Sequence, residues 1–298
     1  MNLTESDLEK ISRLPVSEQA EFLELIEEYE SAKKREDSRV SFIEFVRGMW
    51  PAFIDGEHHK IMADAFERIA RGELKRLIVN MPPRHTKSEF ASYLLPAWFL
   101  GQFPDKKVIQ TAHTAELSVG FGRKVRNLVD DDDFKKVFPE LALRADSKAA
   151  GRWSTNKGGE YFAIGVGGAV TGKGADLLII DDPHSEQEGQ SADPSVFDKT
   201  YDWYTSGPRQ RLQPGGAIVI VMTRWHMRDL TGKIIKSSTQ REGMDEWEVI
   251  EFPAIFYENT AKEKALWPQF WKLEELVSLR SELPASKWMA QYQQNPTS

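Results

Sequence analysis

The sequence predicts an α/β fold in three layers, with helices on both faces of a mainly parallel central sheet. Short apolar runs of strand length alternate along the chain with longer segments whose apolar residues recur at helical spacing. One run, residues 177–180, is apolar without interruption, which is typical of a parallel strand buried on both faces. Strands and helices that alternate in this order favour a parallel sheet covered by helices on both sides.

The composition limits the classes of protein to consider. A chain of 298 residues, 40% of them hydrophobic, can form one large domain or two smaller ones. Its longest apolar run, residues 217–222, is far shorter than the roughly 18 residues of a membrane-spanning helix, and the early acids Glu5, Asp7 and Glu9 do not fit a signal peptide. We therefore expect an intracellular protein with no membrane association. The chain has no cysteine, which excludes disulfides and thiol catalysis, and its net charge of −7 is uninformative about a nucleic-acid partner.

Residues 1–50 are expected to form an N-terminal helical element. Residues 1–37 carry apolar positions at helical spacing that break at Pro15, which predicts two short amphipathic helices, and residues 38–50 continue as a third. The main interpretation is a docking appendage or a solvated helical pair, and the alternative is a partner-binding arm. A further helix over residues 59–70 leads into the first strand.

The loop after the first strand carries the main functional signal. It reads Asn-Met-Pro-Pro-Arg-His-Thr-Lys-Ser at residues 80–88, and a helical segment follows it. A strand, a tight loop and a helix in this order are typical of a phosphate-binding loop, G-x-x-x-x-G-K-[ST], in which the lysine reaches the outer phosphates and the hydroxyl holds magnesium. Lys87 and Ser88 fit the end of this pattern, but Met81 and Thr86 occupy its glycine positions, so we expect more reliance on side chains than on backbone N–H groups. The alternative is a chance lysine and serine at a helix start.

Two consecutive carboxylates, Asp181 and Asp182, end the apolar run at residues 177–180. In a phosphate-loop enzyme the first acid at such a position supports magnesium and the second polarises the attacking water. An Asp-Asp-Pro turn that caps the next segment is the alternative. The pairing with Lys87 and Ser88 favours the catalytic interpretation.

The remaining elements follow in chain order. The expected strands are residues 77–79, 107–112, 161–166, 177–180 and 217–222, and the expected helices among them are residues 89–95, 115–129 and 197–212. Residues 140–157 are expected to be irregular. The alternation of apolar strands and helices ends after residue 236, so we expect residues 237–298 to form a small lid. This lid is expected to have a strand at 247–252 and helices at 272–283 and 288–294. Its expected core is the aromatic set Trp267, Phe270, Trp271, Trp288 and Tyr292.

Three blocks of sequence, in the same order, resemble the ATPase domain of the large terminase subunit of tailed bacteriophages. They are residues 82–89, residues 172–183, and residues 223–226 with 229–232, and the resemblance extends from about residue 51 to the C-terminal tail. It implies a P-loop NTPase fold of the additional-strand, RecA-like class, with residues 51–236 as its core. In that class the strand at 217–222 lies between the loop strand and the carboxylate strand.

The resemblance implies ATP hydrolysis that powers translocation of viral double-stranded DNA into a procapsid, with ATP and Mg²⁺ as cofactors. Lys87 would neutralise the outer phosphates, Asp182 would orient the attacking water, and Thr223 would couple hydrolysis to motion. The implied magnesium ligands are Ser88 and Asp181. The implied ATP-binding residues are Pro83, Arg84, His85, Thr86, Lys87 and Ser88, with His59 on the side of the base.

An additional cation is expected to stabilise charge in the transition state. Arg84 resembles the loop arginine of large terminases, which acts within its own subunit, and its alternative role is to brace the loop. Lys173 lies near the position of an arginine proposed to act on the next subunit, although lysine lacks the planar fork of arginine. The alternative is a lysine in a flexible turn without a catalytic role. His184 and Glu186 are secondary candidates for the role of Asp182, because aspartate is shorter than the glutamate of many ATPases.

The implied partners are double-stranded DNA, the portal of the procapsid, the small terminase subunit and further copies of the chain in a ring of five, in the host cell cytoplasm. Complete large subunits continue into a nuclease domain, which the sequence up to Ser298 does not contain, so we expect no DNA cleavage. The alternatives are another nucleic-acid-stimulated P-loop motor, such as a helicase, and a nucleotide-binding module without turnover.

Overall fold

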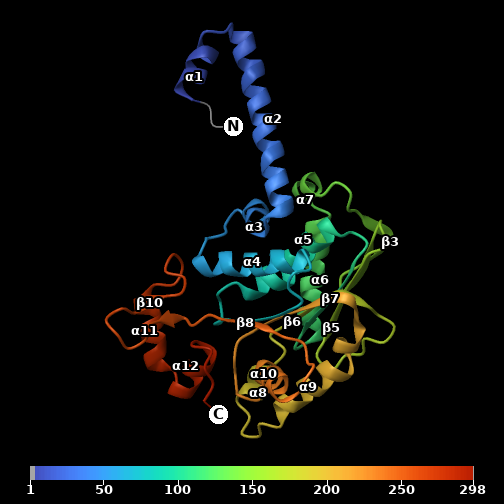
Figure 1. Ribbon diagram of the computed structural model, residues 1–298, viewed down its shortest axis with the longest axis vertical. Coiled ribbons are helices and arrows are strands. Elements are labelled where there is room, and N and C mark those ends of the chain that lie inside the picture. The colour runs from blue at the N-terminus through green and yellow to red at the C-terminus, as the bar shows by residue number, and fades with distance from the viewer. Residues whose placement is uncertain (1–3, 298) are drawn as a thin grey trace.

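The central sheet of the computed structural model has eight strands within the described residues, 4–297 (Figure 1). Residues 1–3 and 298, which belong to the predicted N-terminal element and lid, lie outside this range. The strand order is β3-β4-β5-β2-β6-β7-β1-β8. The strands are β1 (Arg76–Asn80), β2 (Lys107–Ala112), β3 (Leu143–Ala149), β4 (Arg152–Thr155), β5 (Glu160–Gly165), β6 (Ala175–Asp181), β7 (Leu212–Met222) and β8 (Glu248–Glu251). Every neighbouring pair is parallel except β3–β4 and β4–β5, which confirms the predicted α/β class with a mainly parallel sheet.

Strand β7 lies between β1 and β6, as the sequence predicted for the additional strand. Ile220 pairs with Ile78 on one side and with Ile180 on the other. The three strands therefore end at the same edge of the sheet, and the loops that follow them meet there.

Helices cover both faces of the sheet because successive strand residues point to opposite sides. Leu77 and Val79 face a core formed with α3 (Phe42–Met49), α4 (Glu57–Ala70), the π-helix η1 (Glu89–Leu94), α5 (Leu95–Gln102), α6 (Ala115–Val129) and α7 (Asp132–Val137). Ile78 faces a second core, formed with α9 (Val196–Ser206) and α10 (Leu230–Gln240). The fold is thus the predicted three-layer sandwich (Figure 1).

Within the sheet and its connections, residues 140–157 and 197–212 differ from the sequence prediction. Residues 140–157, expected to be irregular, contain the antiparallel strands β3 and β4. Trp153 of β4 is buried and stacks on Tyr161 of β5 at 4.9 Å, so pairing with the sheet orders a segment whose local sequence is polar. The helix expected over residues 197–212 ends at Ser206, because Gly207 and Pro208 interrupt it before β7 begins.

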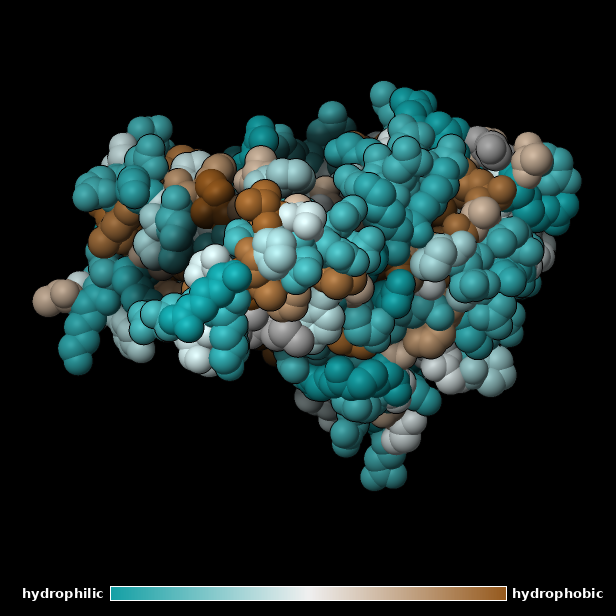
Figure 2. Space-filling model, turned by 90° about the horizontal axis from the view of Figure 1, so that it is seen from above, coloured by the Kyte–Doolittle hydropathy of each residue, from teal (hydrophilic) through white to brown (hydrophobic). Residues whose placement is uncertain are grey.

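The N-terminal helices project from the body of the molecule (Figure 1). Helix α1 (Glu5–Ser12) packs beside α2 (Val16–Val40), which is much longer than predicted and continues past residue 38, where a third helix was expected to start. Ser38 is the one buried residue of α2, and α1 has none. Seen from the side of this arm, the surface is mainly hydrophilic and is interrupted by apolar patches (Figure 2).

The C-terminal segment forms a small subdomain with its own core, made of β9 (Ile255–Phe256), β10 (Lys264–Ala265), α11 (Leu273–Glu282) and α12 (Ala285–Gln291). Strand β8 precedes it and pairs with β1, so the central sheet continues beyond residue 236 into the segment that we assigned to the lid. Trp267 and Trp288 are buried as expected, but Phe270 is 48% exposed and does not belong to the core. No helix among the described residues is both long and apolar enough to span a membrane.

Candidate phosphate-binding site

The loop between β1 and η1 has the backbone of a glycine loop without glycine. Thr86, at the second glycine position, has φ +75°, and Arg84 has φ +61°. Residues with a Cβ atom enter this left-handed region at a cost of roughly 1–2 kcal/mol each. Met81, at the first position, continues the sheet instead, because its N–H donates to the Met222 carbonyl at 3.1 Å.

A buried histidine stabilises the strained Thr86. The ring Nε2 of His59 lies 2.6 Å from the Thr86 hydroxyl oxygen, which also contacts the His85 carbonyl. His85 in turn is buried, with its Nδ1 2.8 Å from the Pro83 carbonyl oxygen. His59 is fully buried and supports the loop through Thr86, while its expected contact with the base stays a prediction.

The loop lysine, the second acid and the threonine after β7 meet at the sheet edge. Lys87 Nζ lies 2.9 Å from Asp182 Oδ2, and the Lys87 side chain is almost completely buried. The other oxygen of Asp182 accepts the Thr223 N–H at 2.8 Å, and the Thr223 hydroxyl donates to the Met81 carbonyl at 3.1 Å. Asp182 also has a positive φ, +39°, immediately after β6. The structure therefore brings together three residues that the sequence predicted as catalytic.

Ser88 and Asp181 form the second half of the site. The Ser88 hydroxyl donates to Asp181 Oδ1 at 3.0 Å, and the hydroxyl of Ser92, one helical turn later, donates to Oδ2 at 2.7 Å. Burial raises the pKa of Asp181 to about 7, and the charge of Asp182 adds to this effect, while Lys87 and the two hydroxyls lower the pKa. A cation bound at this carboxylate would favour its ionised form.

The donor set of this site fits magnesium. Mg²⁺ prefers oxygen ligands and is usually held by one or two carboxylates together with substrate phosphates and water. Ser88 and Asp181 present such oxygens side by side. Among residues 4–297 no group of three or more histidine, cysteine or acidic residues is arranged to hold a metal, so phosphate and water oxygens would complete the coordination.

The two candidate cations lie in different places. Arg84 is exposed on the loop and lines a cavity beside it. Lys173 pairs with Glu160 at 3.1 Å, and Glu160 begins β5 at the opposite edge of the sheet, next to Lys107. Lys173 therefore does not join the site within its own chain.

The two secondary acid–base candidates have other surroundings. His184 is buried, and its Nε2 accepts the Leu230 N–H at 2.9 Å. Glu186 is exposed at the start of α8 (Glu186–Gly189). Asp182 is thus the acid that directly contacts Lys87.

A solved structure of a bacteriophage protein shares this architecture. The large terminase of bacteriophage HK97 aligns with a TM-score of 0.52 at 13% sequence identity, over 82% of this chain and 51% of its own. The chain has the fold of a bacteriophage large terminase. It spans about half the length of the HK97 protein.

Two further large terminases align less closely. The ATPase domain from Thermus phage P74-26 has a TM-score of 0.46 at 16% identity, over 78% of this chain and 92% of that domain. The large terminase of another thermophilic bacteriophage, solved in complex with ADP, has a TM-score of 0.44 at 7% identity, over 77% of this chain and 52% of its own. No protein-family model and no curated protein matches the sequence.

Within this terminase fold, sequence reasoning missed two residues behind the acid pair. Ser92 bonds Asp181 directly, and the amide Nε2 of Gln110 on β2 donates to the Ser92 hydroxyl at 3.2 Å. Ser92 had a signal, since it lies one helical turn after Ser88 and so shares its face. Gln110 had none, because only the sheet brings β2 next to β6.

A buried ion pair extends the site away from the loop. Arg224, next to Thr223, binds Asp229 with Nε 2.9 Å from Oδ2. Asp229 is fully buried and caps α10, because its Oδ1 accepts the Gly232 N–H at 2.9 Å. The Arg224 N–H donates to Gln294 Oε1 at 3.1 Å, which ties the end of β7 to the C-terminal subdomain. In this structure Asp182 is thus connected to the subdomain through Thr223, its chain neighbour Arg224, and Gln294.

Proposed function

We propose that this chain is a magnesium-dependent ATPase whose activity powers the translocation of viral double-stranded DNA into a procapsid. The observation that supports this most directly is the convergence of Lys87, Ser88, Asp181, Asp182 and Thr223 at one edge of the sheet, around a loop with the backbone of a phosphate-binding loop. The large terminase fold supports the same proposal.

The roles follow from the chemistry of each group. Lys87 neutralises the outer phosphates, Ser88 and Asp181 hold magnesium, and Asp182 orients the attacking water. Magnesium, when bound, offsets the negative charge that develops on the phosphate oxygens. Arg84, exposed on the loop, is the candidate for additional charge stabilisation from the same subunit. Lys173 is left as a candidate for a contact with a neighbouring subunit.

The Lys87–Asp182 ion pair gives the site a ligand-dependent switch. A phosphate that attracts Lys87 competes with Asp182 for the same ammonium group, and Asp182 Oδ2 then becomes available to water. The other oxygen of Asp182 stays connected to Thr223, and Thr223 adjoins the Arg224–Asp229 pair. We infer that this path carries the state of the nucleotide to α10 and the C-terminal subdomain.

The partners belong to the same proposal. They are double-stranded DNA, the portal of the procapsid, the small terminase subunit and further copies of the chain in a homo-oligomeric ring, expected to have five members. The proposed DNA translocation takes place in the host cell cytoplasm. These assignments derive from the sequence resemblance and the terminase fold.

The test is steady-state ATP hydrolysis as a function of protein concentration, with and without double-stranded DNA. Lys87→Ala and Asp182→Asn are each expected to lower kcat by roughly 100-fold or more, while Lys60→Ala, a substitution of an exposed lysine on α4, retains the parent rate. A specific activity that rises with protein concentration would support assembly into a ring.

Other outcomes would favour the alternatives. Nucleotide binding without hydrolysis would indicate a binding module, a function consistent with the mutual neutralisation of Lys87 and Asp182. Hydrolysis accompanied by separation of DNA strands would indicate a helicase. Hydrolysis that survives Lys87→Ala would contradict the assigned site.

A further inference from the structure

The cavity that Arg84 lines lies directly beside the phosphate-binding loop. It has a volume of about 640 Å³ and lies between the segment after α3 and the C-terminal subdomain. Its wall includes Trp50, Ile54, Arg84, Thr86, Phe270 and Trp271. Two of these residues belong to the loop itself, so a molecule whose phosphates lie on the loop can extend into this cavity.

The aromatic wall of the cavity is exposed and yet well ordered by packing. Phe270 is 48% exposed, and its ring stacks on buried Trp267 with centroids 4.4 Å apart at 19°. An exposed aromatic face that is held by a buried partner, at the rim of a cavity, is typical of a ligand-binding surface.

Two contacts attach this wall to the loop. The Trp271 indole N–H donates to the Arg84 carbonyl at 3.3 Å. Trp267 packs edge-on against His59 at 5.0 Å, and His59 in turn bonds Thr86. The aromatic wall and the strained loop backbone therefore form one connected unit.

We propose that this cavity binds the base of the nucleotide whose phosphates lie on the loop, and that Phe270 provides the stacking surface. The proposal rests on the proposed function, since it requires a nucleotide at the loop. Every base has a flat π-face, and stacking on an aromatic side chain typically raises affinity roughly 5- to 100-fold. Stacking requires a flat base and not a particular pattern of hydrogen-bonding groups. The wall therefore favours any nucleotide over a bare polyphosphate, which has no base.

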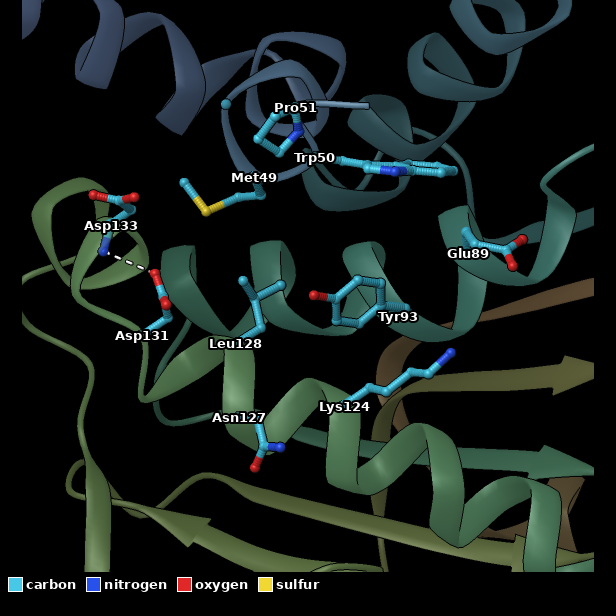
Figure 3. Close-up of a pocket in the computed structure, with 11 residues that line it drawn as sticks. Met49, Trp50, Pro51, Glu89, Tyr93, Lys124, Asn127, Leu128, Asp131 and Asp133 are labelled. Carbon is cyan, nitrogen blue, oxygen red and sulfur yellow. Dashed lines mark hydrogen bonds between the residues drawn. The ribbon is translucent and has the colours of Figure 1, made fainter. Parts of the chain in front are cut away.

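A neighbouring cavity of about 630 Å³ is the competing location (Figure 3). It shares Trp50 and Glu89 with the cavity beside Phe270, and Figure 3 shows Trp50 and Tyr93 on opposite sides of it. Its wall contains no residue of the loop at 80–88, and its far end carries the carboxylates of Asp131 and Asp133. The connection to the loop therefore favours the cavity beside Phe270 as the site of the base.

The experiment compares the affinities of two ligands by calorimetry in the presence of Mg²⁺. The ligands are the non-hydrolysable ATP analogue AMP-PNP and inorganic tripolyphosphate. Phe270→Ala is expected to weaken AMP-PNP binding roughly 5- to 100-fold and to leave tripolyphosphate binding unchanged. Phe270→Tyr retains the aromatic face and the parent affinity, whereas Phe270→Leu does not. The control is Tyr257→Ala, because Tyr257 is an aromatic residue of the same subdomain that is 65% exposed.

The outcomes separate this proposal from the proposed function. A parent protein that binds neither ligand overturns both. A parent protein that binds AMP-PNP no more tightly than tripolyphosphate overturns the base site and leaves the phosphate site standing. The base site is also overturned if Phe270→Ala keeps the parent affinity for AMP-PNP, or if Tyr93→Ala alone removes the preference for the nucleotide.

Discussion

At the scale of single residues, Thr86 combines an unfavourable backbone with a favourable side-chain contact. Its φ of +75° is the conformation of a loop glycine, and its hydroxyl is 2.6 Å from His59 Nε2. A net hydrogen bond contributes about 1 kcal/mol, which is similar to the cost of the left-handed backbone. The threonine is therefore tolerated because a neighbouring helix supplies its partner.

This balance predicts that Thr86→Gly is more stable than Thr86→Ala, the reverse of the usual order in which alanine is the more stabilising residue. Thr86→Gly loses the hydrogen bond but removes the strain, whereas Thr86→Ala loses the hydrogen bond and keeps the strain. The free energy of unfolding of Thr86→Ala is therefore expected to be about 1 kcal/mol lower than that of Thr86→Gly. Urea denaturation of both variants measures this difference. An alanine variant at least as stable as the glycine variant would show that the loop backbone is not strained.

Three buried histidines behind the loop predict a sensitivity to acid. Burial, together with the neighbouring charge of His85, lowers the pKa of His58 to about 4. Burial likewise lowers the pKa of His59 to about 2 and that of His85 to about 4. Below pH 6.5 the unfolded chain therefore binds more protons at these histidines than the folded chain does. Their contribution to the free energy of unfolding is fully present above pH 6.5 and is lost as the pH falls towards 4.

The test replaces His58, whose two ring nitrogens have no hydrogen-bond partner among the described residues. His58→Phe keeps the contacts with Phe252 and Trp267 and removes the titrating group. We expect it to reduce the loss of stability between pH 6.5 and pH 4 by up to about 3 kcal/mol. Urea denaturation across this pH range is the measurement, and an unchanged pH profile would contradict the assignment to His58.

At the scale of elements, the segment after β7 depends on one buried carboxylate. Asp229 binds the Arg224 guanidinium and accepts N–H groups from Trp225, His226 and Gly232, so it fixes both the turn and the start of α10. Removing one partner of a buried ion pair leaves an uncompensated charge. The path from Thr223 to the C-terminal subdomain therefore depends on Asp229.

We predict that Asp229→Ala lowers the free energy of unfolding by about 3–5 kcal/mol. The double substitution Arg224→Met with Asp229→Ala is expected to recover part of this loss, because the unpaired charge is removed as well. Chemical denaturation of the single and double variants measures the coupling. A double variant with the summed loss of the two single variants would show that the two side chains do not act as a pair.

At the scale of the whole molecule, the body and the N-terminal arm differ in how they are stabilised. The body has two large cores, one on each face of the sheet. Helix α2 is attached near its C-terminal end, where the Ser38 carbonyl accepts the Trp98 indole N–H at 3.0 Å and Arg39 Nε donates to the Val137 carbonyl at 2.6 Å. The earlier part of the arm adds no buried residue to either core.

Deletion of residues 1–31 is therefore expected to leave the thermal unfolding midpoint of the body within about 2 °C of the parent value, because little apolar area is lost from the core. Differential scanning calorimetry measures this midpoint. Deletion of residues 1–41 serves as the comparison and is expected to be destabilising, since it removes the contacts of Ser38 and Arg39. A large effect of the shorter deletion would mean that the arm packs on the body.

The sequence by itself determined the class of fold and predicted which residues form the candidate site. Hydrophobic runs of strand length that alternate with segments of helical spacing favour a parallel sheet, because strands buried on both faces are apolar throughout. Charged and hydroxyl groups directly after buried strands need a bound ion, a ligand or another polar group as a partner. This made it possible to identify the candidate site residues Lys87, Ser88, Asp181 and Asp182. The order of β7 between β1 and β6 followed from the resemblance to large terminases.

Only the tertiary structure decided which residues lie together across long separations in sequence. The outer strands β3 and β4 form because β5 offers β4 a pairing partner, not because their own residues favour strands. His59 became a support for the loop and Lys173 became a partner of Glu160, since both assignments depend on packing between distant segments. Phe270, expected in a core, lies exposed beside the loop for the same reason. The sequence shows that a residue is apolar, but only the folded chain determines which segments cover it.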